Sequence, residues 1–125
     1  MEEEAIAFLR AEPAARTGIA SGTPQVRFER HELNQILSIY GRMVAAGEWR
    51  DYAVDFLEDY AAFSIFRRAS EMPMFRVEKR PKLKSRQGQY CVIAAGGHVL
   101  KRGHDLAQVL RVFDAKLFKA QAAQA

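Results

Sequence analysis

Residues 74–103 constrain the fold more than any other stretch, because their pattern predicts two successive β-hairpins. In the first part, Phe75 and Val77 alternate with charged residues, which is typical of a strand with one buried face. Pro81 must leave this strand, since proline has no N–H to donate to a ladder and restricts the residue before it. After a loop, residues 89–95 resume a strand, which predicts a hairpin across that loop.

The second hairpin turns at Gly96-Gly97, the clearest turn signal in the chain. Glycine tolerates positive φ at both central positions, as a tight two-residue turn requires. A third strand then runs to Gly103. The tight turn predicts four facing pairs: Ala95 with His98, Ile93 with Leu100, Val92 with Lys101, and Cys91 with Arg102.

Two earlier segments, 49–58 and 61–68, alternate in part between apolar and polar residues, and we predict that both are strands. Glu58-Asp59 is the expected turn between them. A helix over 51–62 is the alternative, because three aromatic residues also fall there at helical spacing: Tyr52, Phe56 and Tyr60. We favour the strands, and the helical reading stays open at this point.

Two segments show the periodicity of a helix with one buried face. The first spans about 30–46 and stops at Gly47, a natural C-terminal residue for a helix. Its apolar stripe consists of Leu33, Ile36, Leu37, Tyr40 and Val44. The second follows Asp105, which can cap it, with Gln108 at the capping-box position. Its stripe consists of Leu106, Val109, Leu110, Phe113 and Leu117.

This order of elements predicts an α+β domain. We expect a mostly antiparallel β-meander of about five strands with two amphipathic helices packed on it. At 125 residues, the chain is long enough for one domain with a modest core. We expect that domain at 25–119, a mobile N-terminal tail at 1–24 and a frayed C-terminal tail at 120–125.

Positive charge is concentrated in residues 60–104, which hold ten Lys or Arg against two Glu. The loop 79–86 is the densest part. Such a local surplus indicates an acidic partner, so we expect a non-catalytic protein that contacts nucleic acid or another polyanion. The candidate binding residues are Lys79, Arg80, Lys82, Lys84, Arg86, Lys101 and Arg102. The competing interpretation is solvated charge that deters sheet-to-sheet aggregation.

An enzyme is the less favoured class, and we expect no cofactor. The sequence has no phosphate loop, no dinucleotide-binding glycine pattern and no serine nucleophile elbow. His31, His98 and His104 lack the spacing of metal ligands, so no metal site is predicted. Cys91 lies in the middle of a strand, which favours a buried, inert thiol over a reactive one.

A protein–protein adaptor or homodimerising module is the main alternative function. A small sheet with exposed edges offers a surface on which a second copy or a partner strand can pair. Trp49 is of the type that anchors interfaces. The favoured reading of Trp49 is that it plugs the gap between the first helix and the sheet.

The sequence predicts no association with a membrane. Its longest stretch without charged residues, Gln87–Leu100, is too short to span a bilayer, which takes about 20 apolar residues. The first residues are acidic, so we expect no signal peptide. A lone cysteine excludes an internal disulfide, and a cytoplasmic location is the expectation.

Four runs of residues are distinctive together: YGRMVAAGEWRDYA, FRRASE, EKRPKL and LKRGH. Over about residues 26–113 the chain resembles an uncharacterised family of small bacterial proteins, a domain of unknown function. The resemblance implies a bacterial, cytoplasmic, single-domain protein. It implies no activity and supplies no catalytic or binding residues.

Overall fold

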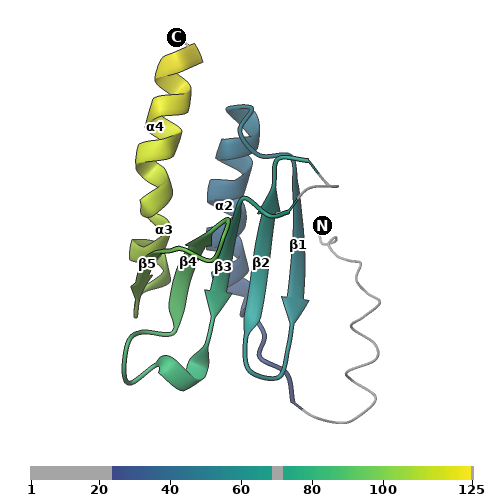
Figure 1. The fold of residues 1–125 in the computed structure, drawn as a ribbon, viewed down its shortest axis with the longest axis vertical. Helices are drawn as coiled ribbons and strands as arrows, with labels where there is room; N and C mark the ends of the chain where they lie inside the picture. Colours follow the sequence, from purple (N-terminus) through teal and green to yellow (C-terminus); the bar gives the residue numbers. More distant parts are fainter. Residues whose placement is uncertain (1–23, 69–71, 125) are drawn as a thin grey trace.

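The computed structural model describes residues 24–68 and 72–124, and it confirms the predicted α+β fold (Figure 1). The elements, in chain order, are α2 (Arg30–Ala45), β1 (Asp51–Phe56), β2 (Ala61–Phe66), β3 (Phe75–Lys79), the 3-10 turn η1 (Pro81–Leu83), β4 (Tyr90–Ala94), β5 (Val99–Gly103), α3 (Leu106–Leu110) and α4 (Val112–Gln124). The predicted tail at 1–24 lies outside the described residues, apart from Pro24.

The five strands form one sheet in the order β1-β2-β3-β4-β5, and every neighbouring pair is antiparallel. Strands that follow each other in the chain are therefore neighbours in the sheet, as in the predicted meander. Residues 51–62 hold β1, a turn and the start of β2, so the strand reading is confirmed and the helical alternative is wrong. Leu57 N donates to Tyr60 O at 2.9 Å, which closes the predicted Glu58-Asp59 turn.

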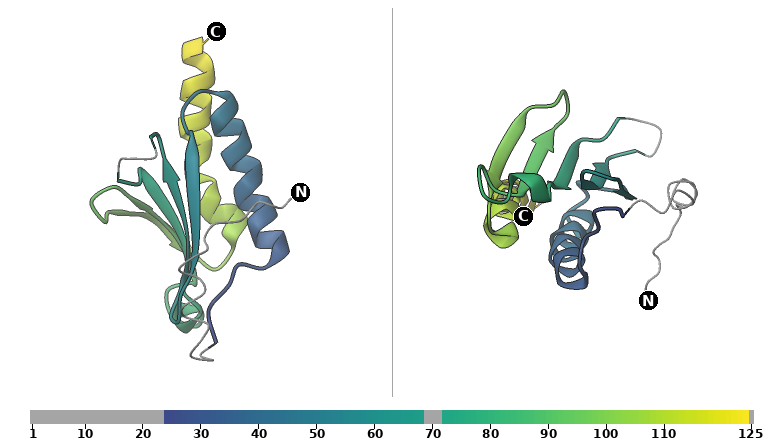
Figure 2. Two further views of the ribbon diagram at one scale, coloured as in Figure 1. Left: turned by 90° about the vertical axis from the view of Figure 1, so that its right-hand side faces the viewer. Right: turned by 90° about the horizontal axis from the view of Figure 1, so that it is seen from below.

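The helices α2, α3 and α4 lie on one face of the sheet (Figures 1 and 2). Side chains alternate between the two faces along a strand. On β2, for example, Ala61, Phe63 and Ile65 are fully buried in the core cluster that the helices complete. The opposite face carries no helix formed by the described residues, and we call it the helix-free face.

The second hairpin differs from the prediction at its turn. Two of the four predicted pairs are confirmed: Cys91 with Arg102, and Val92 with Lys101. The two pairs nearest the turn are wrong, because Ala94 N donates to His98 O at 2.7 Å and the loop has three residues instead of two. Ile93 consequently pairs with Val99. A register shift leaves Leu100 as the extra residue of a β-bulge, which restores the later pairs.

The predicted helix at 30–46 is α2, and its extent is confirmed to within one residue. Its buried face differs from the predicted stripe. The fully buried residues are Glu32, Ile36, Ile39 and Met43. Val44, which belongs to the predicted stripe, is 40% exposed. The helix turns a carboxylate toward the sheet, which a pattern of apolar residues alone does not reveal.

The C-terminal helical segment buries its predicted stripe. All five residues are buried: Leu106, Val109, Leu110, Phe113 and Leu117. Asp105 caps the segment as predicted, since its Oδ1 accepts a hydrogen bond from Ala107 N at 2.9 Å. An interruption at Arg111 divides the segment into α3 and α4. The helix α4 continues to Gln124, and the predicted fraying of 120–125 stays a prediction.

Trp49 fills the space between the helices and the sheet, as the favoured reading predicts. Its side chain is 1% exposed. Its ring lies against Phe113 of α4, Tyr40 of α2 and Phe75 of β3, with centroids 4.9, 6.0 and 6.1 Å away. A ring enclosed on these sides is part of the core, so the interface-anchor alternative is wrong.

Gly88 brings the β3–β4 loop against the end of β5. Its φ is +104°, and a Cβ atom there would lie 2.4 Å from the carbonyl carbon of Gly103. We expect Gly88→Ala to lower the free energy of unfolding by more than about 2 kcal/mol, because the backbone conformation and the close contact both oppose a side chain. Urea unfolding measures this change.

Gly41→Ala on α2 is the control for the Gly88 variant. A Cβ atom at Gly41 meets open space, so alanine should raise the free energy of unfolding by about 0.5–1 kcal/mol through its better helix propensity. If Gly88→Ala were as harmless as this control, the close approach of the loop to β5 would be refuted.

Candidate functional site

Strand β3 divides the predicted basic patch between the two faces of the sheet. Its side chains alternate, so Lys79 points toward the helices and pairs with Glu32 there. Arg76 and Glu78 point to the helix-free face, where they contact each other. Arg80 follows the strand and contacts Glu78 on that same face. The alternation of β3 therefore separates Lys79 from the arginines on either side of it in sequence.

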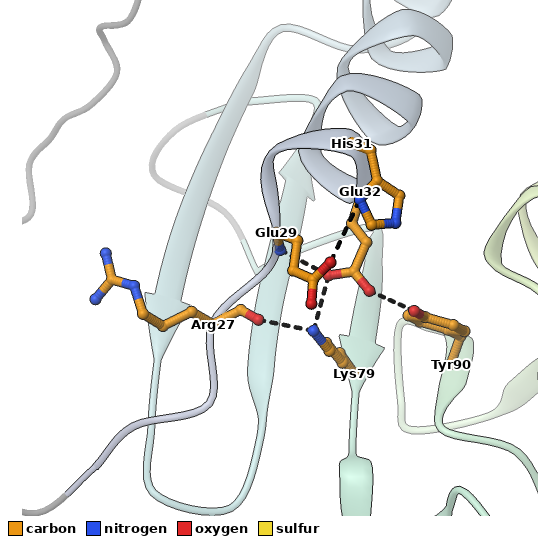
Figure 3. Close-up of polar contacts among 6 residues, drawn as sticks. All are labelled: Arg27, Glu29, His31, Glu32, Lys79 and Tyr90. Carbon is orange, nitrogen blue, oxygen red and sulfur yellow. Dashed lines mark hydrogen bonds and ion pairs between the residues drawn. The ribbon is translucent and has the colours of Figure 1, made fainter.

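Lys79 lies in the interior, between α2 and the sheet (Figure 3). Its Nζ atom lies 2.8 Å from Glu32 Oε1 and donates to the backbone oxygen of Arg27 at 2.9 Å. Tyr90 OH donates to the second carboxylate oxygen, Glu32 Oε2. We call Glu32, Lys79 and Tyr90 the buried network. Lys79 is one of the predicted binding residues, but at 8% exposure it is not part of the surface.

The buried network keeps Glu32 ionised. Burial alone would raise the pKa of the Glu32 carboxyl, because burial disfavours the charged form. The hydrogen bonds from Lys79, Tyr90 and the Glu29 backbone N–H outweigh burial and hold that pKa below its usual value of 4.5. Burial, together with the adjacent Glu32 carboxylate, raises the pKa of Tyr90. At neutral pH, Glu32 is therefore the anion and Tyr90 a neutral donor.

Glu29, His31 and Glu32 bring possible metal-ligating atoms within 4.8 Å of one another. Both oxygens of Glu32 already accept hydrogen bonds from Lys79 and Tyr90, so a metal ion would have to lie beside an ammonium group. His31 Nδ1 lies 3.4 Å from Glu29 Oε1 on the exposed side of the helix. These contacts fit a helix start better than a metal centre.

A second buried carboxylate, Glu78, lies on the helix-free face. It is 1% exposed, although no helix of the described residues covers it. Arg76 Nη2 lies 2.6 Å from Glu78 Oε2, and Arg80 Nε lies 2.9 Å from Oε1. The Arg80 guanidinium also stacks on the Tyr60 ring, 4.0 Å from its centroid. Two arginines thus cover one carboxylate, each through one of its oxygens.

Arg102 of β5 completes this group from the far side of β4. It pairs with Cys91, which in turn pairs with Glu78. Arg102 Nη1 and Arg76 Nε are buried and have no hydrogen-bond partner among the described residues. A buried donor without an acceptor costs about 1–3 kcal/mol. We call Arg76, Arg80 and Arg102 the arginine cluster, and together with Glu78 it carries a surplus of positive charge.

Cys91 forms the floor beneath the arginine cluster, and its side chain is fully buried. Burial raises the pKa of the Cys91 thiol, and the nearby charge of Arg102 opposes this only in part. The thiol is therefore protonated at neutral pH. The predicted burial of Cys91 is confirmed, and its inertness stays a prediction.

Three further predicted binding residues lie on the exposed β3–β4 loop. Lys82 Nζ lies 2.9 Å from Asp59 Oδ1, so it bridges this loop to the β1–β2 turn. Lys84 and Arg86 form no ion pair with any described residue. The free positive charge of the loop therefore comes from Lys84 and Arg86.

The structure gathers only some of the predicted binding residues. It places Arg80 and Arg102 together in the arginine cluster, whereas Lys101 points to the helix side, where it lines a shallow hollow with Arg111. Arg76 belongs to the basic residues of the stretch 60–104 but not to the seven candidate binding residues. Its signal in the sequence is the alternation that places it on the same face as Glu78, two positions away.

We expect Glu32→Gln to lower the free energy of unfolding by about 3–5 kcal/mol, because it leaves Lys79 buried without its counter-ion. The pKa of Glu32 is lowered by folding, so its contribution is fully present above pH 4.5 and is lost as the pH falls through the folded-state pKa. The stability difference between wild type and variant should therefore narrow below pH 4.5. Urea unfolding at a series of pH values measures it.

Glu58→Gln is the matched control, because it removes an exposed carboxylate. It should change the free energy of unfolding by less than about 0.5 kcal/mol. A Glu32→Gln effect no larger than this, or one that stays constant down to acid pH, would contradict the role of the buried network.

None of the helices formed by the described residues has both the length and the apolar character that crossing a bilayer requires.

Comparison with known proteins identifies the family. No curated protein and no solved structure matches the chain. A family model described as a protein of unknown function (DUF2794) matches residues 26–110, which hold α2, the five strands and α3. The chain therefore belongs to this family, as the resemblance over about 26–113 predicts.

Proposed function

We propose that the protein binds nucleic acid through its helix-free face and the adjoining β3–β4 loop. The arginine cluster carries the proposal, because two guanidinium groups hold a single carboxylate, a third lies on the same face of the sheet beyond β4, and two N–H groups of the cluster have no acceptor among the described residues. Arginine matches the oxygens of a phosphate in geometry as well as in charge. The fit of donors to phosphate oxygens supports a nucleic-acid backbone as the ligand.

The basic surface continues beyond the arginine cluster onto the β3–β4 loop. Lys84 and Arg86 extend it along the β3–β4 loop, which follows directly after Arg80. At the opposite edge of the helix-free face, β1 exposes Asp51 and Asp55. A phosphate backbone would therefore follow the β3–β5 half of the sheet and avoid β1.

The competing interpretation, solvated charge that deters aggregation, accounts for Lys84 and Arg86 but not for the arginine cluster. Charges that serve solubility lie in water. The side chains of Arg76 and Arg80 are instead only 42% and 35% exposed, and Arg102 holds a buried nitrogen. Arginines held against the sheet in this way support a binding role.

We place this activity in the cytoplasm of a bacterium. The resemblance to small bacterial proteins and the free thiol of Cys91, which suits a reducing compartment, support that location.

Fluorescence anisotropy with labelled DNA and RNA, single- and double-stranded, tests the proposal at about 50 and about 200 mM salt. We expect binding that weakens steeply with salt. Lys84→Ala/Arg86→Ala should weaken binding several-fold and lower the salt dependence. With fewer phosphate contacts, fewer counterions are released from the nucleic acid on binding. The matched control is Lys116→Ala/Lys119→Ala, which removes the same charge from α4 on the other side of the sheet.

No binding at the lower salt would refute the proposal. Equal losses in the two double variants would show that net charge, and not the helix-free face with its loop, drives the association. We expect the α4 variant to bind as the wild type does.

The outer edges of β1 and β5 support a second candidate function, self-association. Neither edge pairs with another strand of the described residues. The β1 edge exposes Asp51 and Asp55 and the β5 edge exposes Lys101, so the two edges are complementary in charge. Pairing β1 of one copy with β5 of the next would join copies head to tail. Sedimentation velocity over a range of protein concentrations would detect such assembly.

A further inference from the structure

The arginine cluster has donors that its own carboxylate does not use. Each oxygen of Glu78 already accepts one hydrogen bond, from Arg76 Nη2 and from Arg80 Nε. Arg76 Nε and Arg102 Nη1 remain without an acceptor among the described residues. These two N–H groups come from different strands. A small ligand with several oxygens, such as a phosphate, can accept hydrogen bonds from both.

The two arginines lie on either side of β4. Neighbouring strands are about 4.8 Å apart, so the backbones of β3 and β5 are separated by about 10 Å. Ile93 lies opposite Arg76, and Cys91 lies opposite Arg102. The floor between the guanidinium groups is therefore uncharged, and Glu78, the carboxylate opposite Cys91, is already held by Arg76 and Arg80.

An aromatic side chain lies next to Arg76. Phe66 ends β2 on the helix-free face, and Ser64, two residues before it, pairs with Arg76. Phe66 is therefore a diagonal neighbour of Arg76, with Cα atoms about 7–8 Å apart. The Phe66 ring is half-buried and makes no ring contact with another described aromatic residue. Part of this side chain is thus exposed to a partner.

We infer that the ligand is single-stranded nucleic acid, with a phosphate between Arg76 and Arg102 and an adjacent base stacked on Phe66. This inference rests on the proposed function and names its substrate class. A single strand exposes the faces of its bases and can bend its backbone onto a flat surface. A duplex keeps its bases stacked inside, and its grooves admit a helix or a two-stranded ribbon but not a five-stranded sheet.

The test uses the full chain and labelled oligonucleotides of about twelve nucleotides, as thymidine and uridine homopolymers and as a mixed-sequence duplex. Arg102→Gln is the main variant, because Arg102 forms no ion pair in the described part of the chain. Lys101→Gln is its matched control, since it removes the same charge from the adjacent residue on the opposite face. Arg102→Lys keeps the charge but loses the planar donor group.

We expect the wild type to bind the single strands at least about ten-fold more tightly than the duplex. Arg102→Gln should weaken single-strand binding about ten-fold, as the loss of a charged hydrogen bond predicts, and lower the salt slope by about 0.7. Lys101→Gln should stay within about two-fold of the wild type. Thermal unfolding of each variant shows that it is folded, and Arg102→Lys replaces Arg102→Gln if the latter is not.

Phe66→Leu tests the stacking contact separately, because leucine keeps the apolar volume but has no ring face. We expect it to weaken single-strand binding about five-fold or more and to leave the salt slope unchanged.

The outcomes distinguish a failure of the single-strand site from a failure of the proposed nucleic-acid binding. If single strands and duplex bind equally well, or if Arg102→Gln behaves as Lys101→Gln does, the single-strand site is refuted while nucleic-acid binding stands. If no nucleic acid binds at low salt, both are refuted. Normal single-strand binding by Phe66→Leu would overturn the placement of the base.

Discussion

The rest of the structure depends on the hydrogen bonds that the buried carboxylate of Glu32 accepts. It accepts hydrogen bonds from Lys79 at the end of β3, from Tyr90 at the start of β4 and from the Glu29 backbone N–H at the start of α2. A buried charge is costly unless it is fully paired, and these donors pair it. These bonds tie the start of α2 to β3 and β4, and Ile36, Ile39 and Met43 bury the same face of the helix in the core.

Strand β3 joins this structural core to the candidate site. Its period of two sends Val77 and Lys79 toward the helices and sends Arg76 and Glu78 to the helix-free face. A buried carboxylate thus lies on each side of the strand: Glu32 of α2 on the helix side and Glu78 on the helix-free face. The carboxylate on the helix side accepts hydrogen bonds from both Lys79 and Tyr90, whereas on the helix-free face two arginine N–H groups have no acceptor among the described residues. Those N–H groups are the chemical basis of the proposed nucleic-acid surface.

Periodicity predicted those elements whose stability comes from apolar burial. The stripe that includes Val109 and Phe113 is fully buried, and the strand pairs of Cys91 and Val92 lie where the hairpin prediction placed them. The prediction failed where a local detail decided the outcome. A third loop residue moved the pairs nearest Gly96-Gly97, and the partners of Glu32 rotated α2 away from a purely apolar stripe. Both effects depend on contacts that spacing does not encode.

The sequence by itself determined the fold class and the concentration of positive charge in residues 60–104, whereas the structure gave the order of the strands in the sheet. Patterns of period two and 3.6, together with turn residues, are local properties and can be read along the chain. Only the tertiary structure decided which of those charges are available. In the structure, Lys79 forms a buried ion pair and Lys101 lies on the helix side of the sheet. Arg76, Arg80 and Arg102 lie together on the helix-free face. Pairing between distant segments sets the partner of each charge, and composition does not contain that information.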